Sequence, residues 1–181
     1  MKYYLKLGFI LLLITAIASG ILAYMNSITA PIIAENQAKE QELARKEVLP
    51  LAKTFKEISG DFSYFEGLDD SGNKVGYTFV ASLYGYSSDV KTMVGVSNEM
   101  VIEKIKIISQ AETPGLGANC EKSEFQAQFS NKKVDVMAAD KDGGAIKSIT
   151  GATITTRTIA NSIKIGLDKL VLSVSKEEVA K

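Results

Sequence analysis

The stretch Val101–Ile108 (VIEKIKII) alternates apolar residues with charged ones, and this alternation decides the class of fold that we expect. It is typical of a strand in an antiparallel sheet that has one buried face and one solvated face. Lys91–Val96 precedes it across a short turn, so the two runs predict a hairpin. Val75–Leu83 (VGYTFVASL) and Asp61–Glu66 extend the pattern toward the N-terminus. Together these runs predict an antiparallel sheet.

Helical patterns flank the predicted sheet. Thr155–Ser173 has apolar residues at helical spacing and a polar remainder, which predicts an amphipathic helix that closes the domain. Ala34–Leu51 is rich in Ala, Glu, Gln and Lys, so we expect a polar helix that ends at Pro50. Between the last strand and the closing helix, Ala118–Gln126 predicts a short helix and Val134–Ala138 a further strand. Helix, strands and helix in this order predict an α+β domain.

The N-terminal segment Leu7–Met25 contains no charged residue. Its length matches the about 20 apolar residues that a helix needs to cross a membrane. Lys2 and Lys6 precede it, whereas the chain beyond it stays neutral until Glu35. This asymmetry predicts a single-pass anchor in the cytoplasmic membrane, with the N-terminus in the cytoplasm and the domain outside. A cleaved signal peptide is the alternative, although its apolar core usually has only about 7–15 residues.

The amino-acid composition limits the cofactors that the chain could bind. The 181 residues carry 21 basic and 21 acidic side chains, so nothing indicates a nucleic-acid partner. There is no histidine, and Cys120 is the single cysteine, which argues against a metal, haem or iron–sulfur site and against an internal disulfide. Redox chemistry would therefore need an organic cofactor. We divide the chain into an anchor at residues 1–28, a polar stalk at 29–52 and one domain at 53–181.

One segment of small and hydroxyl-bearing residues, Ser148–Arg157 (SITGATITTR), joins a glycine turn to the closing helix. Small residues let the backbone approach a ligand closely, and hydroxyl and N–H groups at the start of a helix suit a phosphate. Ser and Thr before a helix are more often simple N-caps. The residues alone leave both interpretations open.

A second segment, Gln110–Gly117 (QAETPGLG), follows a predicted strand directly. Pro-Gly with another Gly two residues later makes a tight exposed loop. An ordinary turn is the simpler interpretation. The alternative is a loop that places backbone amides and the side chains of Glu112 and Thr113 against a planar ligand.

Taken together, these features resemble the flavin-carrying G subunit of the Rnf electron-transport complex. The resemblance covers the apolar span, the polar helix, the Glu-Thr-Pro-Gly-Leu-Gly loop, the Lys141–Gly144 turn and the Thr-Gly-Ala-Thr segment. It extends to the FMN-binding domain of the C subunit of sodium-pumping NADH:quinone reductase. It implies a small extracytoplasmic FMN-binding domain that carries electrons in a membrane complex, which couples electron transfer between ferredoxin and NAD to ion translocation. The implied partners are the other subunits, the membrane and a flavin transferase.

The resemblance also implies a site. One FMN per chain would be attached through its phosphate to the hydroxyl of Thr153, by the flavin transferase. The other implied cofactor-binding residues are Thr150, Gly151, Ala152, Glu112, Thr113, Gly115, Leu116, Gly117 and Lys141. Lys141 is expected to neutralise the phosphate, to stabilise reduced flavin or to face solvent, and Arg157 to pair with the phosphate or face water. The chain departs from the family at Lys147, where the family often has an Asp that the transferase recognises.

Three alternatives remain from the sequence. The chain could be the equivalent subunit of the sodium-pumping reductase, although its shortness favours the Rnf family. It could be a membrane-anchored interaction or assembly module without flavin, an option that Lys147 keeps open. It could also be an independent FMN-binding reductase that serves a soluble partner. We expect no catalytic side chain and no independent active site in the leading interpretation.

Overall fold

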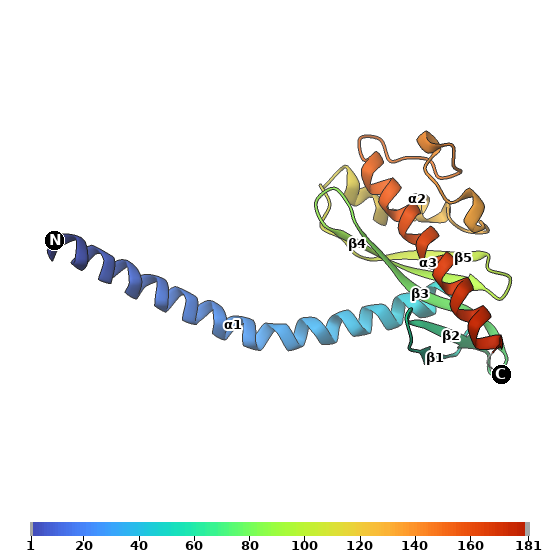
Figure 1. Cartoon of the computed structure of the whole chain (residues 1–181), viewed down its shortest axis with the longest axis horizontal. Helices are drawn as coiled ribbons and strands as arrows, with labels where there is room; N and C mark the ends of the chain where they lie inside the picture. The colour runs from blue at the N-terminus through green and yellow to red at the C-terminus, as the bar shows by residue number, and fades with distance from the viewer. Residues whose placement is uncertain (1, 180–181) are drawn as a thin grey trace. The chain divides into compact units, whose positions relative to one another are not determined.

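The computed structural model describes residues 2–179, beginning with a long helix, α1, and ending with a second, α3 (Figure 1). The elements are α1 (Lys2–Val48), β1 (Thr54–Ile58), β2 (Tyr64–Leu68), β3 (Lys74–Tyr84), β4 (Asp89–Ser97), β5 (Ile102–Ser109), η1 (Gly117–Glu121), α2 (Ser123–Ala127), η2 (Val134–Val136), η3 (Asp140–Asp142) and α3 (Thr153–Val179). The chain forms two compact units that divide between Glu40 and Gln41, inside α1.

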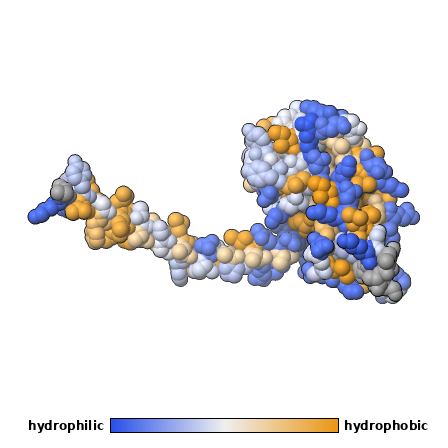
Figure 2. All heavy atoms as spheres, viewed as in Figure 1, coloured by the Kyte–Doolittle hydropathy of each residue, from blue (hydrophilic) through white to orange (hydrophobic). Residues whose placement is uncertain are grey.

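The first unit is the N-terminal part of α1, which is long and apolar enough to cross a membrane. Figure 2 shows apolar residues gathered along it. The helix continues without a break into the polar stretch, and it ends at Val48 rather than at Pro50. The earlier end has a physical reason, because proline disfavours helical geometry in the residue before it. The proposed boundaries at residues 28 and 52 remain predictions.

The second unit contains a five-stranded sheet in the order β1-β2-β3-β4-β5, in which every neighbouring pair is antiparallel. This meander confirms the predicted α+β class with antiparallel strands. The predicted run Val75–Leu83 lies in β3, and Val101–Ile108 corresponds to β5. The first strand, β1, has no counterpart in the prediction. It is a short edge strand with no fully buried side chain, so its sequence lacks a clear apolar alternation.

Two predictions between β5 and α3 need correction. The expected strand at Val134–Ala138 is wrong, because Val134–Val136 forms a short 3₁₀ helix. Just before this run, Lys132 forms an isolated bridge with Ile102 of β5, and the chain then turns into the 3₁₀ helix. The expected helix at Ala118–Gln126 is split into η1 and α2, since the extended backbone of Lys122 separates them.

Helix α3 packs on one face of the sheet and forms the main core. Its buried side chains Ile159, Ile163 and Leu167 meet apolar residues of the central strands, among them Phe79. The approach is so close at Gly166 that a Cβ atom there would lie 2.2 Å from Cε2 of Phe79. Burial of this apolar surface is the principal force that fixes α3, and with it the start of α3, against the sheet.

The end of α1 covers the opposite face of the same sheet, within the second unit. Ala44 and Val48 are buried there against Met93 of β4. Gly95 permits this contact, because a Cβ atom at that position would lie 2.2 Å from the carbonyl oxygen of Val48. The sheet is therefore covered on both faces.

Candidate functional site

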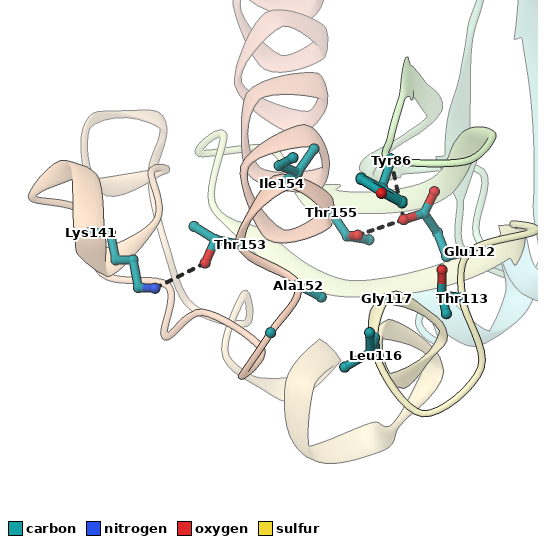
Figure 3. Close-up of a pocket in the computed structure, with 11 residues that line it drawn as sticks. Tyr86, Glu112, Thr113, Leu116, Gly117, Lys141, Ala152, Thr153, Ile154 and Thr155 are labelled. Carbon is teal, nitrogen blue, oxygen red and sulfur yellow. Dashed lines mark hydrogen bonds between the residues drawn. The ribbon is translucent and has the colours of Figure 1, made fainter.

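A cavity of about 560 Å³ opens at the N-terminal end of α3 (Figure 3). Its volume lies within the usual range for small-molecule sites. Four segments form its wall: the turn between β3 and β4, the loop that follows β5, the short helix η3, and the residues that lead into the first turn of α3. The lining residues are Tyr86, Glu112, Thr113, Leu116, Gly117, Lys141, Gly151, Ala152, Thr153, Ile154 and Thr155.

The cavity brings together all the predicted cofactor residues except Thr150 and Gly115. These two residues line a shallower neighbouring hollow, which shares Leu116 with the cavity. Sequence reasoning missed Tyr86, Ile154 and Thr155 as lining residues. Tyr86 follows a glycine that ends a strand, so its pattern indicates only a turn, and the other two lie in the helix that follows the motif.

Thr153 is the first residue of α3, and its side chain is half-buried in the cavity wall. Its Oγ1 accepts a hydrogen bond of 3.1 Å from Nζ of Lys141, as Figure 3 shows. The start of a helix carries a partial positive charge and unpaired N–H groups. A hydroxyl, an ammonium group and a helix N-terminus therefore meet at one end of the cavity, and this combination suits a phosphate.

The neighbouring threonine hydroxyl groups of α3 donate hydrogen bonds to acceptors inside the protein. Thr155 donates to the carboxylate of Glu112 at 2.6 Å. Thr156 and Thr158 donate to backbone carbonyl groups, at 3.2 Å in each case. All three threonines are buried, and Thr155 lines the cavity with its hydroxyl bound to Glu112, whereas Thr153 is only half-buried. The local packing thus separates Thr153 from the other threonines of the same helix start.

Glu112 lies at the other end of the cavity and is only 5% exposed. Its Oε1 accepts hydrogen bonds from the N–H groups of Ser87 at 2.9 Å and Ser88 at 3.3 Å. Its Oε2 accepts from the N–H of Tyr86 at 3.3 Å and from the Thr155 hydroxyl at 2.6 Å. The predicted role of this residue was a ring contact. The structure places its carboxylate as a brace that joins three of the four wall segments: its own loop, the turn between β3 and β4, and the start of α3.

The charge state of Glu112 follows from these contacts. Burial raises the pKa of its carboxyl group. The hydrogen bonds from Thr155 and from the backbone N–H groups of Ser87, Ser88 and Tyr86 lower this pKa by a larger amount. The net pKa lies below the ordinary value, so the group is a carboxylate at neutral pH. Within residues 2–179, no ion pair joins a cation to it.

Gly117 allows the loop after β5 to close over this brace. A Cβ atom at that position would lie 2.7 Å from Oε2 of Glu112 and 2.8 Å from Oγ1 of Thr155. Both contacts are shorter than van der Waals separation, and the atoms concerned are held by their own hydrogen bond. Only glycine therefore fits at position 117 without displacing the Glu112–Thr155 pair.

The loop that carries Lys141 is fastened on both sides. Asp142 forms two hydrogen bonds with Arg157 of α3, each of 2.6 Å. Asp140 accepts a hydrogen bond of 3.1 Å from the N–H of Ser148, and a further one from its hydroxyl. Arg157 was expected to meet the phosphate or face water. In the structure it pairs with Asp142, so Lys141 is the cation that reaches Thr153.

Two other residues singled out in the sequence lie outside the cavity. The side chain of Lys147 borders the neighbouring hollow, and its backbone N–H donates to Gln128. Cys120 is fully buried, and burial, with the charges of Glu121 and Glu112, raises the pKa of its thiol to about 12. A thiol with so high a pKa is unreactive.

The donor set fits FMN and does not fit a metal. The cavity offers a hydroxyl and an ammonium group at one end for a phosphate. It also offers apolar and aromatic surface from Leu116, Ala152, Ile154 and Tyr86 for a planar ring. Among the described residues, no group of three or more Cys, Asp or Glu side chains could hold a metal ion.

Comparisons with known families agree with this geometry. The model of the FMN-binding domain matches residues 85–168, a range that includes every residue lining the cavity. The model of the RnfG N-terminal region matches residues 2–48, which correspond to α1.

Individual relatives align over most of the chain. The chain is 31% identical to the G subunit of the ion-translocating oxidoreductase complex of Methanosarcina acetivorans, over 87% of this chain and 89% of the relative. It is 32% identical to the G subunit of the proton-translocating ferredoxin:NAD(+) oxidoreductase complex of Clostridium ljungdahlii, over 88% of each. A solved structure of the C subunit of the Na(+)-translocating NADH-quinone reductase from Parabacteroides distasonis shares the fold. Its TM-score is 0.53 at 18% identity, over 74% of this chain and 94% of that chain.

Proposed function

The chain belongs to the family of G subunits of Rnf-type ion-translocating oxidoreductase complexes, and from this premise we propose that it carries electrons on one FMN bound covalently to Thr153. Its place as an electron-transfer subunit of such a membrane complex follows from the family and from the FMN-binding domain. Bound FMN supplies the group that accepts and releases electrons, which the side chains of this chain do not provide.

The observation that carries the covalent assignment is the contrast among the threonines at the start of α3. The hydroxyl of Thr153 lines the cavity and faces the ammonium group of Lys141. The hydroxyls of Thr155 and Thr156 are buried and donate to acceptors inside the protein. A phosphate could reach either of them only after a buried hydrogen bond was broken, and such a loss is costly.

Attachment at Thr153 forms one bond and breaks another. The Thr153 oxygen bonds to the phosphorus of FMN, the hydroxyl loses its proton, and the bond from that phosphorus to the leaving group of the flavin donor breaks. A flavin transferase supplies the donor and catalyses the exchange. The diester that results keeps one negative charge, which Lys141 and the N-terminus of α3 stabilise. Thr153 is therefore an attachment point and takes no part in electron transfer.

The remaining residues position the ring and shield it from water. Leu116, Ala152 and Thr113 supply contact surface, and Gly117 and Gly151 allow close approach of the backbone. A covalent tether also prevents loss of the cofactor on the outer side of the membrane, where free FMN would be scarce. We place the N-terminus in the cytoplasm and the domain outside, where it meets its transferase and the other subunits of the complex.

The alternatives gain little from the structure. The match to the RnfG N-terminal region favours the Rnf family over the equivalent subunit of the sodium-pumping reductase. The interpretation as a module without flavin depends on Lys147, where the chain departs from the family. Lys147 borders the hollow beside the cavity rather than the cavity itself. Its substitution therefore leaves the lining of the proposed flavin site unchanged.

In-gel fluorescence tests this proposal. The full-length chain is co-expressed with a flavin transferase, denatured and separated on a gel. We expect a fluorescent wild-type band, a dark band for Thr153→Val and a fluorescent band for Thr155→Val, which makes the same chemical change two residues away. A dark wild-type band would contradict covalent attachment and favour a module without flavin.

A further inference from the structure

We propose that Glu112 is a fixed negative charge in the wall of the flavin cavity, and that it lowers the midpoint potential of the bound flavin against the opposing effect of Lys141. The inference rests on FMN as the occupant of the cavity. It adds a role that the fold alone does not give, because it makes one side chain a determinant of how readily the subunit accepts electrons.

The geometry of Glu112 keeps its charge in place. The carboxylate is 5% exposed and accepts four hydrogen bonds, so it has no freedom to turn away from the cavity that it lines. All four donors are neutral. In the described part of the chain no ammonium or guanidinium group pairs with it. Neutral donors stabilise a carboxylate but leave its net charge, and therefore its field, uncancelled.

The same charge already affects another group. Burial is the main reason for the high pKa of the Cys120 thiol, and the negative charges of Glu121 and Glu112 raise it further. Glu112 thus disfavours the negatively charged form of a neighbouring group. A ligand in the cavity touches the wall that contains this carboxylate, so it lies within range of the same field.

Reduction of a flavin changes its charge in the relevant direction. If FMN occupies the cavity, two electrons from the electron donor of the complex and one proton from solvent would leave its ring one unit more negative. A nearby fixed anion disfavours that product, and a nearby cation favours it. Lys141 and Glu112 lie on opposite sides of the start of α3 in Figure 3, so the two charges act on the occupant from different ends.

Potentiometric titration of the flavin in the full-length, flavin-loaded chain tests the proposal. Glu112→Gln removes the charge with little change of shape, and we expect its midpoint potential to rise. The expected shift is about 30 mV, equivalent to a tenfold change in the equilibrium constant of a two-electron couple. Lys141→Gln should shift the potential in the negative direction. Thr155→Val removes one hydrogen bond to Glu112 but keeps the charge, so it should give no positive shift.

The sign of the shifts separates an electrostatic role from a structural one. If the substitutions acted only through loss of packing, the midpoint potentials of the Glu112 and Lys141 variants would shift without regard to the sign of the charge removed. The proposal requires the two potentials to shift in opposite directions. Unchanged potentials, or shifts in the same direction, would overturn it while the proposed flavin attachment stands. A wild-type chain without flavin would instead refute the proposed function.

A second pair of variants serves if Glu112→Gln does not fold. Glu112→Asp keeps the negative charge, and Tyr86→Lys adds an ammonium group on an exposed residue whose N–H already contacts Glu112. We expect no positive shift from Glu112→Asp and a positive shift from Tyr86→Lys. An unchanged potential in Tyr86→Lys would overturn the proposal.

Discussion

The two ends of the cavity are built in different ways. At the attachment end, formed by Lys141 and Thr153, one hydrogen bond of 3.1 Å joins an exposed ammonium group to a half-buried hydroxyl. At the braced end, formed by Glu112 and Thr155, a buried carboxylate holds three chain segments through four hydrogen bonds. The difference shows how a site can leave one hydroxyl free to react while its shape and charge are fixed elsewhere.

Loss of the Glu112 brace should have the largest effect on stability. Glu112→Ala leaves the Thr155 hydroxyl and three backbone N–H groups without their acceptor. The Thr155 hydroxyl is buried, and an unsatisfied buried group costs about 1–3 kcal/mol, whereas water can reach the N–H groups of the partly exposed turn. We therefore expect the free energy of unfolding to fall by about 3 kcal/mol. Lys141→Ala at the attachment end should leave the midpoint of urea unfolding unchanged. Equal losses in the two variants would break the distinction between the ends.

Crowding of the braced end should have a smaller effect. Gly117→Ala places a Cβ atom 2.7 Å from the carboxylate of Glu112. Overpacking of this kind costs about 2 kcal/mol, which thermal unfolding can detect. The matched control is Gly60→Ala, because no heavy atom lies within 4 Å of a Cβ atom at that position. A melting temperature for Gly117→Ala equal to that of the control would show that the loop is not held against the brace.

The braced end should also respond to acid. The pKa of Glu112 is lower in the folded protein than its value of 4.5 in an unfolded chain. Its contribution to stability is therefore complete above that value and is lost as the pH falls through the lower folded pKa. As the pH falls below 4.5, wild type should lose more stability than Glu112→Gln, in which the other carboxyl groups titrate unchanged. Parallel pH profiles would contradict the lowered pKa.

The smallest expected effect concerns the loop of the attachment end. Arg157→Met breaks the exposed ion pair with Asp142, which should leave stability nearly unchanged. It also loosens the loop that presents Lys141, so we expect flavin attachment to slow by about two- to threefold. In a Lys141→Ala background, Arg157→Met should add nothing to the time course of in-gel fluorescence. An additive effect there would mean that Arg157 acts independently of Lys141.

Periodicity predicted the sheet and the closing helix because both bury one face and solvate the other. It failed where burial is weak or partners are missing. Strand β1 has no buried side chain, and among the described residues Val134–Val136 pairs with no strand. Such segments are decided by tertiary pairing, which no local pattern contains.

The candidate site was predicted in part. The residues alone left both an N-cap and a phosphate site open, and the resemblance to a flavin-binding family selected Thr153. The brace could not be predicted, because Glu112 binds backbone N–H groups of a turn that lies 24–26 residues earlier in the chain. Backbone donors have no side-chain signature, so Tyr86 and its turn gave no signal in the sequence.

The most direct test of covalent attachment at Thr153 is the mass spectrum of one tryptic peptide. Trypsin cleaves after Lys147 and Arg157 and releases the peptide 148–157 (SITGATITTR) from the co-expressed, full-length chain. The account predicts that this peptide gains the mass of FMN less one water. Fragments should place the gain on Thr153, with the C-terminal Thr-Thr-Arg fragment unmodified. An unmodified peptide, or a gain on Thr150 or Thr155, would contradict it.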